Sequence, residues 1–223
     1  MFLGVLRLLL PLLASGFTAQ FTLAGTVQGD ARLIDGDTIE IREQVIRLHG
    51  IDAPETGQRC FDGDDRAYPC GKEATDALRA LIGGRQVICN GDSFDAHGRL
   101  IALCRTANGD LNREMVHQGW AVAFRRYSED YLEEELDAFK AGRGIWRGRF
   151  QRPYEMRAER WKVAEQNAPK GCPIKGNISN RGRIYHAPWS QYYDRTRINT
   201  AKGERWFCSE AEAIRAGWRA PYR

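Results

Sequence analysis

The segment RLHGIDAPET, from Arg47 to Thr56, places one arginine and two carboxylates around a proline turn. Arg47 precedes Asp52 by one strand end, and Glu55 directly follows Pro54. Cleavage of a phosphodiester bond needs a guanidinium that stabilises phosphoryl charge, a carboxylate that holds a divalent cation and a second carboxylate that takes a proton from water. These side chains meet that need, although an arginine at a strand end and an Asp-x-Pro turn also occur on ordinary protein surfaces. The meaning of the segment therefore depends on the rest of the chain.

The residues around this segment alternate with the two-residue period of strands. Ile39 and Ile41 share one face, and Ile46 and Leu48 face opposite to Arg47. The pattern predicts a hairpin followed by a return strand, with a turn at residues 35–37.

Helical spacing begins after this region, over residues 71–82, and Gly83 and Gly84 end it. The other expected elements are strands at 86–89 and 100–104 and helices beginning at Asp110 and capped by Ser128. Five short strands with an inserted helix and trailing helices are typical of a small closed barrel of the OB type. We therefore predict a mainly β fold with α-helices, a five-stranded OB barrel followed by a small domain rich in cysteine and aromatic residues.

The first twenty residues, MFLGVLRLLLPLLASGFTAQ, are typical of a secretory signal peptide. The apolar run is too short to span a membrane comfortably. A retained anchor helix is the alternative, but Pro11 interrupts the run and no charged stop-transfer flank follows. We expect a secreted or periplasmic monomer that is free of the membrane after cleavage.

All six cysteines follow this segment, and their even number suits disulfides in an oxidising compartment. Fifteen connectivities are possible. The pairs nearest in sequence are Cys60 with Cys70, Cys89 with Cys104, and Cys172 with Cys208. Zinc is the weaker alternative, because no C-x2-C spacing occurs and a site at Cys172, His186 and Cys208 lacks an obvious fourth ligand.

Charge is unevenly distributed along the chain. Residues 1–150 hold 18 Lys and Arg against 22 Asp and Glu, a net of −4, whereas residues 151–223 hold 15 against 7, a net of +8. Aromatic and arginine residues interleave in this tail as in proteins that stack bases and contact phosphates, and we name Arg181 and Arg183 as candidate nucleic-acid contacts. Alternatively, the aromatic residues form the core of a small domain.

Composition divides the chain into four parts. The signal peptide at residues 1–20 precedes a barrel domain at 21–150, and a charged helical linker at 151–170 leads to a small basic and aromatic domain at 171–223.

Two more residues extend the site around Arg47. The turn at Asp37 should lie near the end of the strand that carries Arg47, so Asp37 and Asp52 can converge on one cation with Glu55 behind them. Oxygen ligands favour calcium or magnesium over zinc. Arg99 can meet the same phosphate from another side. For Asp37 alone, an ordinary hairpin turn is the simpler interpretation.

Six motifs in this order and spacing resemble the staphylococcal nuclease (thermonuclease) family over roughly residues 25–150. They are IDGDT (34–38), RLHGIDAPET (47–56), GKEA (71–74), DAHGR (95–99), LNREMVHQGWA (111–121) and GIW (144–146). The resemblance implies an OB barrel and a calcium-dependent phosphodiesterase that acts on DNA and RNA. It further implies calcium ligands at Asp37, Asp52 and the Ala53 carbonyl, a general base at Glu55, and phosphate clamps at Arg47 and Arg99.

The chain departs from the family pattern at two places. Ala53 replaces a threonine, which matters little if only its carbonyl binds metal, and Ala96 and His97 replace a lysine and a tyrosine. His97 is a candidate nucleic-acid contact, with an exposed loop histidine as the simpler interpretation.

The tail is similar to a C-terminal module of some secreted bacterial nuclease-like proteins, including ones linked to succinoglycan biosynthesis. The sequence thus predicts an exported, calcium-dependent endonuclease acting on DNA or RNA. The alternatives are a non-catalytic nucleic-acid-binding OB module and an envelope protein that assists exopolysaccharide biosynthesis or export.

Overall fold

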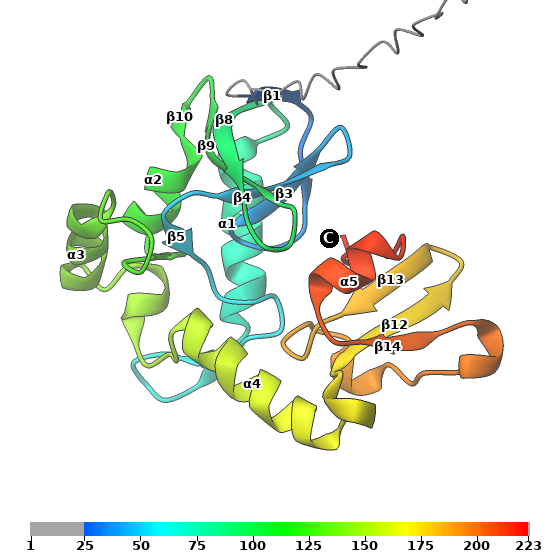
Figure 1. Ribbon diagram of the computed structural model, residues 1–223. Coiled ribbons are helices and arrows are strands. Elements are labelled where there is room, and N and C mark those ends of the chain that lie inside the picture. The colour runs from blue at the N-terminus through cyan, green and yellow to red at the C-terminus, as the bar shows by residue number, and fades with distance from the viewer. Residues whose placement is uncertain (1–24, 223) are drawn as a thin grey trace, which may run out of the picture.

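The computed structural model describes residues 25–222 (Figure 1), so the signal peptide expected at residues 1–20 lies outside them. The first part of the chain is built on one curled, mixed sheet in the order β1-β8-β9-β4-β3-β2, with β10 paired to β9. Its strands are β1 (Gly25–Gly29), β2 (Arg32–Leu33), β3 (Thr38–Ile41), β4 (Gln44–Leu48), β8 (Val87–Phe94), β9 (Leu100–Thr106) and β10 (Gly109–Asp110). Neighbouring strands are antiparallel except β4 and β9, which are parallel.

The expected alternation places the core on one side of β4. Ile46 and Leu48 are fully buried, while Arg47 faces the opposite way and pairs in register with Thr38 of β3. This register brings Arg47 beside the turn that precedes β3, because Asp37 is the residue directly before Thr38. The hairpin predicted from the sequence is therefore confirmed, and it fixes the first geometric relation of the site.

Helices α1 (Cys70–Ile82) and α2 (Leu111–His117) pack on this sheet, and α3 (Leu132–Lys140) packs on α2. Helix α1 stands against the sheet (Figure 1) and buries Ala74, Leu78 and Ile82 in the main core. Helix α2 begins as predicted, since the Asp110 carboxylate accepts a hydrogen bond from the Arg113 N–H.

The prediction that Ser128 caps a helix is wrong. The Ser128 hydroxyl accepts instead from the Asp130 N–H within a turn, and α3 begins four residues later, at Leu132. A short polar side chain that bonds its own backbone two residues on serves a turn as well as a helix start, so the two cannot be told apart from sequence.

Short strand pairs complete this part of the chain. β5 (Ile51–Asp52) pairs with β11 (Val122–Ala123), and β6 (Cys60–Phe61) pairs with β7 (Ala67–Tyr68). A curled mixed sheet that wraps one core beneath covering helices fits an OB-like fold.

A long helix, α4 (Pro153–Asn167), leads to a second, smaller sheet (Figure 1). This sheet has the order β13-β12-β14, with β12 (Ile174–Ser179), β13 (Gly182–His186) and β14 (Arg205–Phe207), and α5 (Glu210–Arg215) packs on it. Its core contains Ile174, Tyr185, Phe207, Ala213 and Trp218, with Trp161 of α4 against it. Several tail aromatics are thus core residues, whereas Tyr192 is 46% exposed.

Three disulfides join Cys60 to Cys70, Cys89 to Cys104, and Cys172 to Cys208, which confirms the pairs nearest in sequence. They are consistent with a secreted or periplasmic protein. Within residues 25–222, no helix is long and apolar enough to cross a bilayer.

The end of the chain returns to the main sheet (Figure 1). The Tyr222 hydroxyl donates a 2.9 Å hydrogen bond to Glu40 of β3, and the guanidinium groups of Arg32 and Arg219 lie 3.8 and 4.0 Å from the Tyr222 ring centroid. The cation–π contact of Arg32 in β2 and the hydrogen bond to buried Glu40 in β3 fasten the C-terminal part to the sheet.

His186 makes the stability of the C-terminal part depend on pH. Its ring is buried, with Nε2 3.0 Å from the Asn177 Oδ1, and burial together with nearby Lys175 lowers its pKa to about 4. Because the unfolded histidine has a pKa near 6.5, the free energy of unfolding should fall as the pH drops from about 6.5 to 4, by on the order of 3 kcal/mol.

His186→Gln should remove most of this loss, measured by urea denaturation at pH 7.5 and 4.5. His117→Gln, at the end of α2, is the control and should keep the pH dependence of the unmutated protein. An equal pH dependence in the His186 variant and the unmutated protein would contradict the assignment.

Candidate active site

The site is organised by Arg47, which binds two buried carboxylates at once. Its Nη1 donates to Asp37 Oδ1 and its Nη2 to Asp52 Oδ1, both at 2.8 Å. Asp37 and Asp52 are almost fully buried, and Arg47 is itself 13% exposed. The β3–β4 register and the short strand β5 position these three groups, which the sequence analysis placed together.

The second oxygen of Asp37 is also engaged. Asp37 Oδ2 accepts the Ala53 N–H at 2.7 Å, and Oδ1 accepts the Thr38 hydroxyl at 2.9 Å. Burial alone would raise the pKa of Asp37, but Arg47 and the Ala53 N–H hold it below its ordinary value. Asp37 is therefore a permanent carboxylate at the base of the site.

Asp52 differs from Asp37 in two respects. Burial raises the pKa of Asp52 despite the guanidinium groups beside it. Its Oδ2 atom is buried and has no hydrogen-bond partner within residues 25–222. A buried carboxylate oxygen with no donor is expensive unless something else binds it, so this atom points to a missing cation or proton.

Asp35 adds a further carboxylate that the sequence analysis treated only as part of a turn. Asp35 Oδ1 accepts the Asp37 N–H at 3.0 Å. Burial, with Asp37 and Glu55 nearby, raises its pKa well above the ordinary value. The carboxylates of this region therefore crowd together and need cations to balance them.

Arg157, a residue of α4 that the sequence analysis did not select, enters the same cluster. Its Nη2 donates to Asp52 Oδ1 at 2.8 Å and its Nη1 to Glu55 Oε1 at 2.7 Å. The guanidinium is 18% exposed, and Glu55 and Asp52 raise its pKa against the effect of burial. Arg157 lies 105 residues after Asp52, so only the folded chain reveals the contact.

Glu55 is mostly buried and has a shifted pKa. Burial raises its pKa to about 7, Arg157 acts in the opposite direction, and Asp37 and Asp52 add to the rise. A carboxylate whose pKa lies near neutrality can accept a proton from water and release it again, which suits a general base.

Arg99 lies apart from this hydrogen-bonded cluster but lines the same cavity as Arg47 and Glu55. Its Nε donates to Asp95 Oδ2 at 2.6 Å, and Asp95 Oδ1 accepts the N–H groups of His97 and Arg99. Burial opposes the charge on Arg99, but Glu210 of α5 and Asp95 raise its pKa. Arg99 is therefore a fixed cation.

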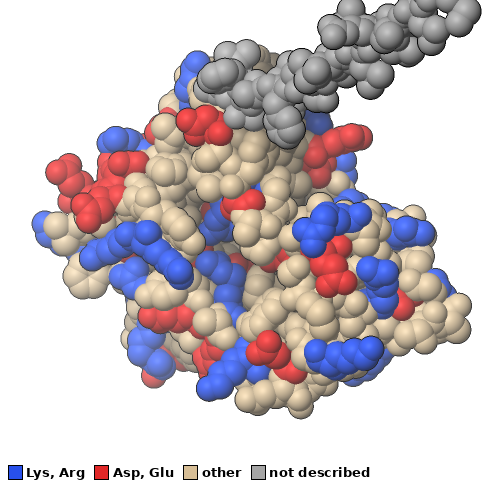
Figure 2. Space-filling model, viewed as in Figure 1, with Lys and Arg blue, Asp and Glu red and all other residues tan. Residues whose placement is uncertain are grey.

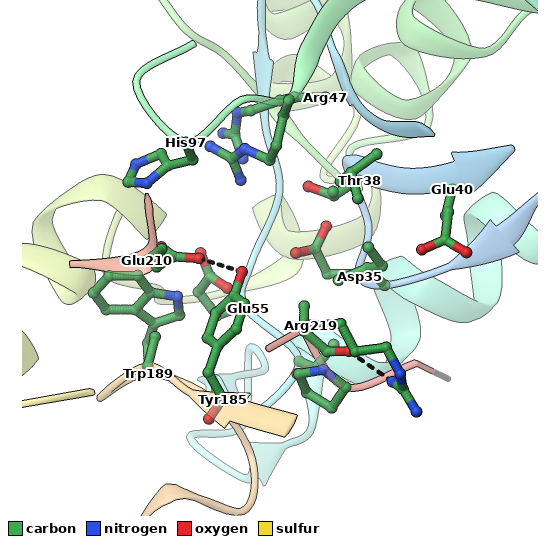
Figure 3. Close-up of a pocket in the computed structure, with 18 of the residues that line it drawn as sticks. Asp35, Thr38, Glu40, Arg47, Glu55, His97, Tyr185, Trp189, Glu210 and Arg219 are labelled. Atoms are coloured by element: carbon green, nitrogen blue, oxygen red, sulfur yellow. Dashed lines mark hydrogen bonds between the residues drawn. The ribbon is translucent and has the colours of Figure 1, made fainter. Parts of the chain in front are cut away.

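A cavity of about 2250 Å³ opens above these groups, between the main sheet and the C-terminal part. Figure 2 shows the hollow, with basic and acidic side chains inside it. In Figure 3, Asp35, Thr38 and Arg47 face Tyr185, Trp189 and Glu210 across this space, and the Tyr185 hydroxyl donates to Glu210 at 2.9 Å. The C-terminal part thus supplies a second wall that the sequence analysis did not predict.

The three candidate nucleic-acid contacts have different positions. His97 and Arg181 line the cavity, and His97 lies beside Arg47 in Figure 3. Arg183 is exposed on β13 and lies outside the lining. Its backbone carbonyl accepts the Arg219 N–H.

The described residues contain no group of three or more His, Cys, Asp and Glu side chains arranged to hold a metal ion. The reason is visible in the contacts, since two guanidinium groups lie between the carboxylates. The donor set itself, several carboxylates with one unpartnered buried oxygen on Asp52, fits a hard cation such as calcium.

Comparison with known proteins agrees with this geometry. Residues 45–148 match the family described as staphylococcal nuclease homologue. An uncharacterized endonuclease of Escherichia coli O157:H7 is 33% identical over 122 residues, which cover 52% of this chain and 73% of that protein. The chain belongs to the staphylococcal nuclease homologue family.

Two other relatives are matched over a smaller share of their length. The succinoglycan biosynthesis protein ExoI of Rhizobium meliloti (strain 1021) is 38% identical over 127 residues, 56% of this chain and 66% of that protein. The probable endonuclease LCL3 of Schizophyllum commune is 31% identical over 129 residues, which cover 49% of this chain and 43% of that protein. The match thus spans less than two thirds of these relatives.

A second family, ArfC, matches residues 153–220. This match begins at the first residue of α4 and so contains Arg157. The cluster around Arg47 therefore combines residues from both matched regions.

The position of Glu55 depends on a glycine in α1. A Cβ atom at Gly71 would lie 1.6 Å from the Glu55 carbonyl oxygen, so the helix and the Glu55 backbone touch only because Gly71 has no side chain. Gly71→Ala should lower the free energy of unfolding by about 3 kcal/mol or more, measured by urea denaturation.

The matched control is Gly63→Ala, whose Cβ would have its nearest neighbour, the Arg147 carbonyl oxygen, at an ordinary 3.5 Å. Equal stability of the two variants would show that α1 and the Glu55 segment are not in this contact.

Proposed function

We propose that this chain is an exported, calcium-dependent endonuclease that hydrolyses phosphodiester bonds of DNA or RNA. The observation that carries the proposal is that the Arg47 guanidinium donates to both Asp37 and Asp52. Arg47 and Glu55 line the same large cleft. Membership of the nuclease family supports the reaction class. Three disulfides support export.

The Asp37 and Asp52 carboxylates and the Ala53 carbonyl would hold calcium. The likeness to the family implies these ligands, and the buried Asp52 Oδ2, which has no hydrogen-bond partner among the described residues, supports them. When bound, such a cation polarises a phosphoryl oxygen and neutralises its charge. Asp37 is suited to this role because its lowered pKa keeps it ionised.

The protein side chains supply the remaining chemistry. Glu55 accepts the proton of the attacking water, for which its pKa near 7 is well placed. Arg47 and Arg99 line the cavity and bind the phosphoryl oxygens, where their planar guanidinium groups stabilise the charge that develops in the transition state.

The cleft supports a polymeric substrate. Its volume of about 2250 Å³ exceeds the roughly 300–1,000 Å³ of small-molecule sites. Trp189 projects into it, as Figure 3 shows, and offers a face on which a base of a single strand can stack. In this arrangement, His97 and Arg181 contact the nucleic-acid strand inside the cleft. Arg183 contacts the nucleic acid only where it continues outside the cleft.

We infer further that the curled sheet is the five-stranded OB barrel of the family, within a domain at 21–150. The linker at 151–170 and the domain at 171–223 follow it, and the protein acts as a monomer.

Glu55→Gln tests the proposal directly. The amide keeps the shape of Glu55 but cannot take a proton, so cleavage of a nucleic acid in the presence of calcium should fall by about 10²–10⁴-fold, measured as the turnover rate with a fluorescent oligonucleotide. Glu159→Gln, an exposed residue of α4, is the control and should retain the full rate. Tight binding without any turnover in the unmutated protein would refute the enzyme and favour a non-catalytic binding module.

Removal of the cation is a separate prediction. A calcium chelator should abolish cleavage, and added calcium should restore it, because the carboxylates and arginines alone provide no Lewis acid. The measurement is nicking of a plasmid over a calcium titration. Full cleavage in the presence of the chelator would contradict calcium dependence while leaving the roles of the side chains open to test.

A second candidate is an envelope protein that assists exopolysaccharide biosynthesis or export. The name of one relative, the succinoglycan biosynthesis protein ExoI, which is 38% identical over 127 residues, favours it. Arg47, Glu55 and Arg99 line one cleft, and Asp52 is buried behind Arg47, an arrangement that favours the nuclease as the primary activity.

A further inference from the structure

Arg157 adds a third guanidinium group to the site. The resemblance to the family implies only two, those of Arg47 and Arg99. It comes from α4, in the segment that matches ArfC and follows the nuclease match at residues 45–148. It binds the two carboxylates that matter most to the proposed function, Asp52 at 2.8 Å and Glu55 at 2.7 Å.

Arg157 is held in contact with Asp52 and Glu55 in the free protein. The Arg157 side chain is only 18% exposed, and both terminal nitrogens of its guanidinium donate charge-assisted hydrogen bonds. One turn further along α4, Trp161 packs against the C-terminal core and lies 6.1 Å from the Trp189 ring centroid. The C-terminal part thus fixes the helix that delivers Arg157.

This position has two electrostatic consequences. A divalent cation that approaches Asp52 meets a fixed positive charge on the same carboxylate, and like charges at such distances repel strongly in a poorly solvated site. Glu55 is at the same time occupied at Oε1 by the hydrogen bond from Arg157. Arg157 thus competes with a cation for Asp52 and with water for Glu55 until it binds another anion.

The substrate supplies that anion. A phosphodiester presents two oxygens that match the planar fork of an arginine, and phosphate is a preferred partner of guanidinium. Arg157 and Arg47 both donate to Asp52 Oδ1, so a phosphate bound by Arg47 lies next to Arg157, and Arg99 lines the same cavity.

We propose that Arg157 is a third phosphate-binding arginine of this site. In the free protein it neutralises Asp52 and Glu55, and when substrate binds it transfers to the phosphodiester. Calcium and substrate therefore bind cooperatively, and Glu55 is released as a base only with substrate in place. This inference rests on the proposed function, and it makes the C-terminal part a component of the active site.

The test is calorimetric titration of calcium into the purified chain, alone and with a non-hydrolysable phosphorothioate dinucleotide. In the unmutated protein the dinucleotide should tighten calcium binding by about tenfold or more. Arg157→Gln should bind calcium alone about tenfold more tightly than the unmutated protein, bind the dinucleotide more weakly, and lose most of the coupling.

Two further variants make the result specific. Arg160→Gln, one turn along α4 with its guanidinium on the Pro188 carbonyl, should behave like the unmutated protein. Arg157→Lys keeps the charge but not the fork, so it should retain weak calcium binding and lose dinucleotide affinity. It also decides the question if Arg157→Gln does not fold, which thermal unfolding will show.

Two results would overturn the inference. Equal calcium affinity in Arg157→Gln and the unmutated protein would show that Arg157 does not obstruct the cation. Tighter dinucleotide binding in Arg157→Gln or Arg157→Lys would show that Arg157 blocks the site and is no phosphate ligand. A protein that shows the expected coupling but cleaves nothing would instead contradict only the proposed function.

Discussion

Burial of several carboxylates in one place is the constraint on which this structure depends. Asp37 and Asp52 are buried beside the partly buried Asp35, where an unpaired charge is costly. Arg47 offsets most of this free-energy cost, because its single planar guanidinium donates to both Asp37 and Asp52. The β3–β4 register holds Arg47 in this position. The turn before β3, the strand β5 and the first turn of α1 must all keep their positions for the fork to form.

The same constraint explains the contribution of the C-terminal part. The cluster keeps an excess of negative charge after Arg47 is counted, and Arg157 supplies a further cation from α4. Tyr185 and Glu210 close the far side of the cleft, and Tyr222 fastens the end of the chain to Glu40. What looks along the sequence like a linker and an appended module is part of one site.

Charge is divided between the two parts in a way that suits this arrangement. The first 150 residues carry a net of −4 and the remaining residues a net of +8, so the parts attract each other across the cleft. The same asymmetry draws a polyanion toward the cleft, beside which Asp37, Asp52 and Glu55 are paired with arginines. On the proposed function, this pairing lets a nucleic acid approach carboxylates that would otherwise repel it.

The sequence by itself determined the local elements and the residues of the first cluster. The two-residue period placed Arg47 opposite Ile46 and Leu48, because strand geometry is local. The cysteine pairs nearest in sequence were one choice among fifteen, and the structure contains them. Only the tertiary structure decided that Arg157 binds Asp52 and Glu55. The helix that carries Arg157 has charged residues on every side, so no periodic pattern shows which of them faces the site. That choice is made by packing between segments about a hundred residues apart, which local rules do not describe.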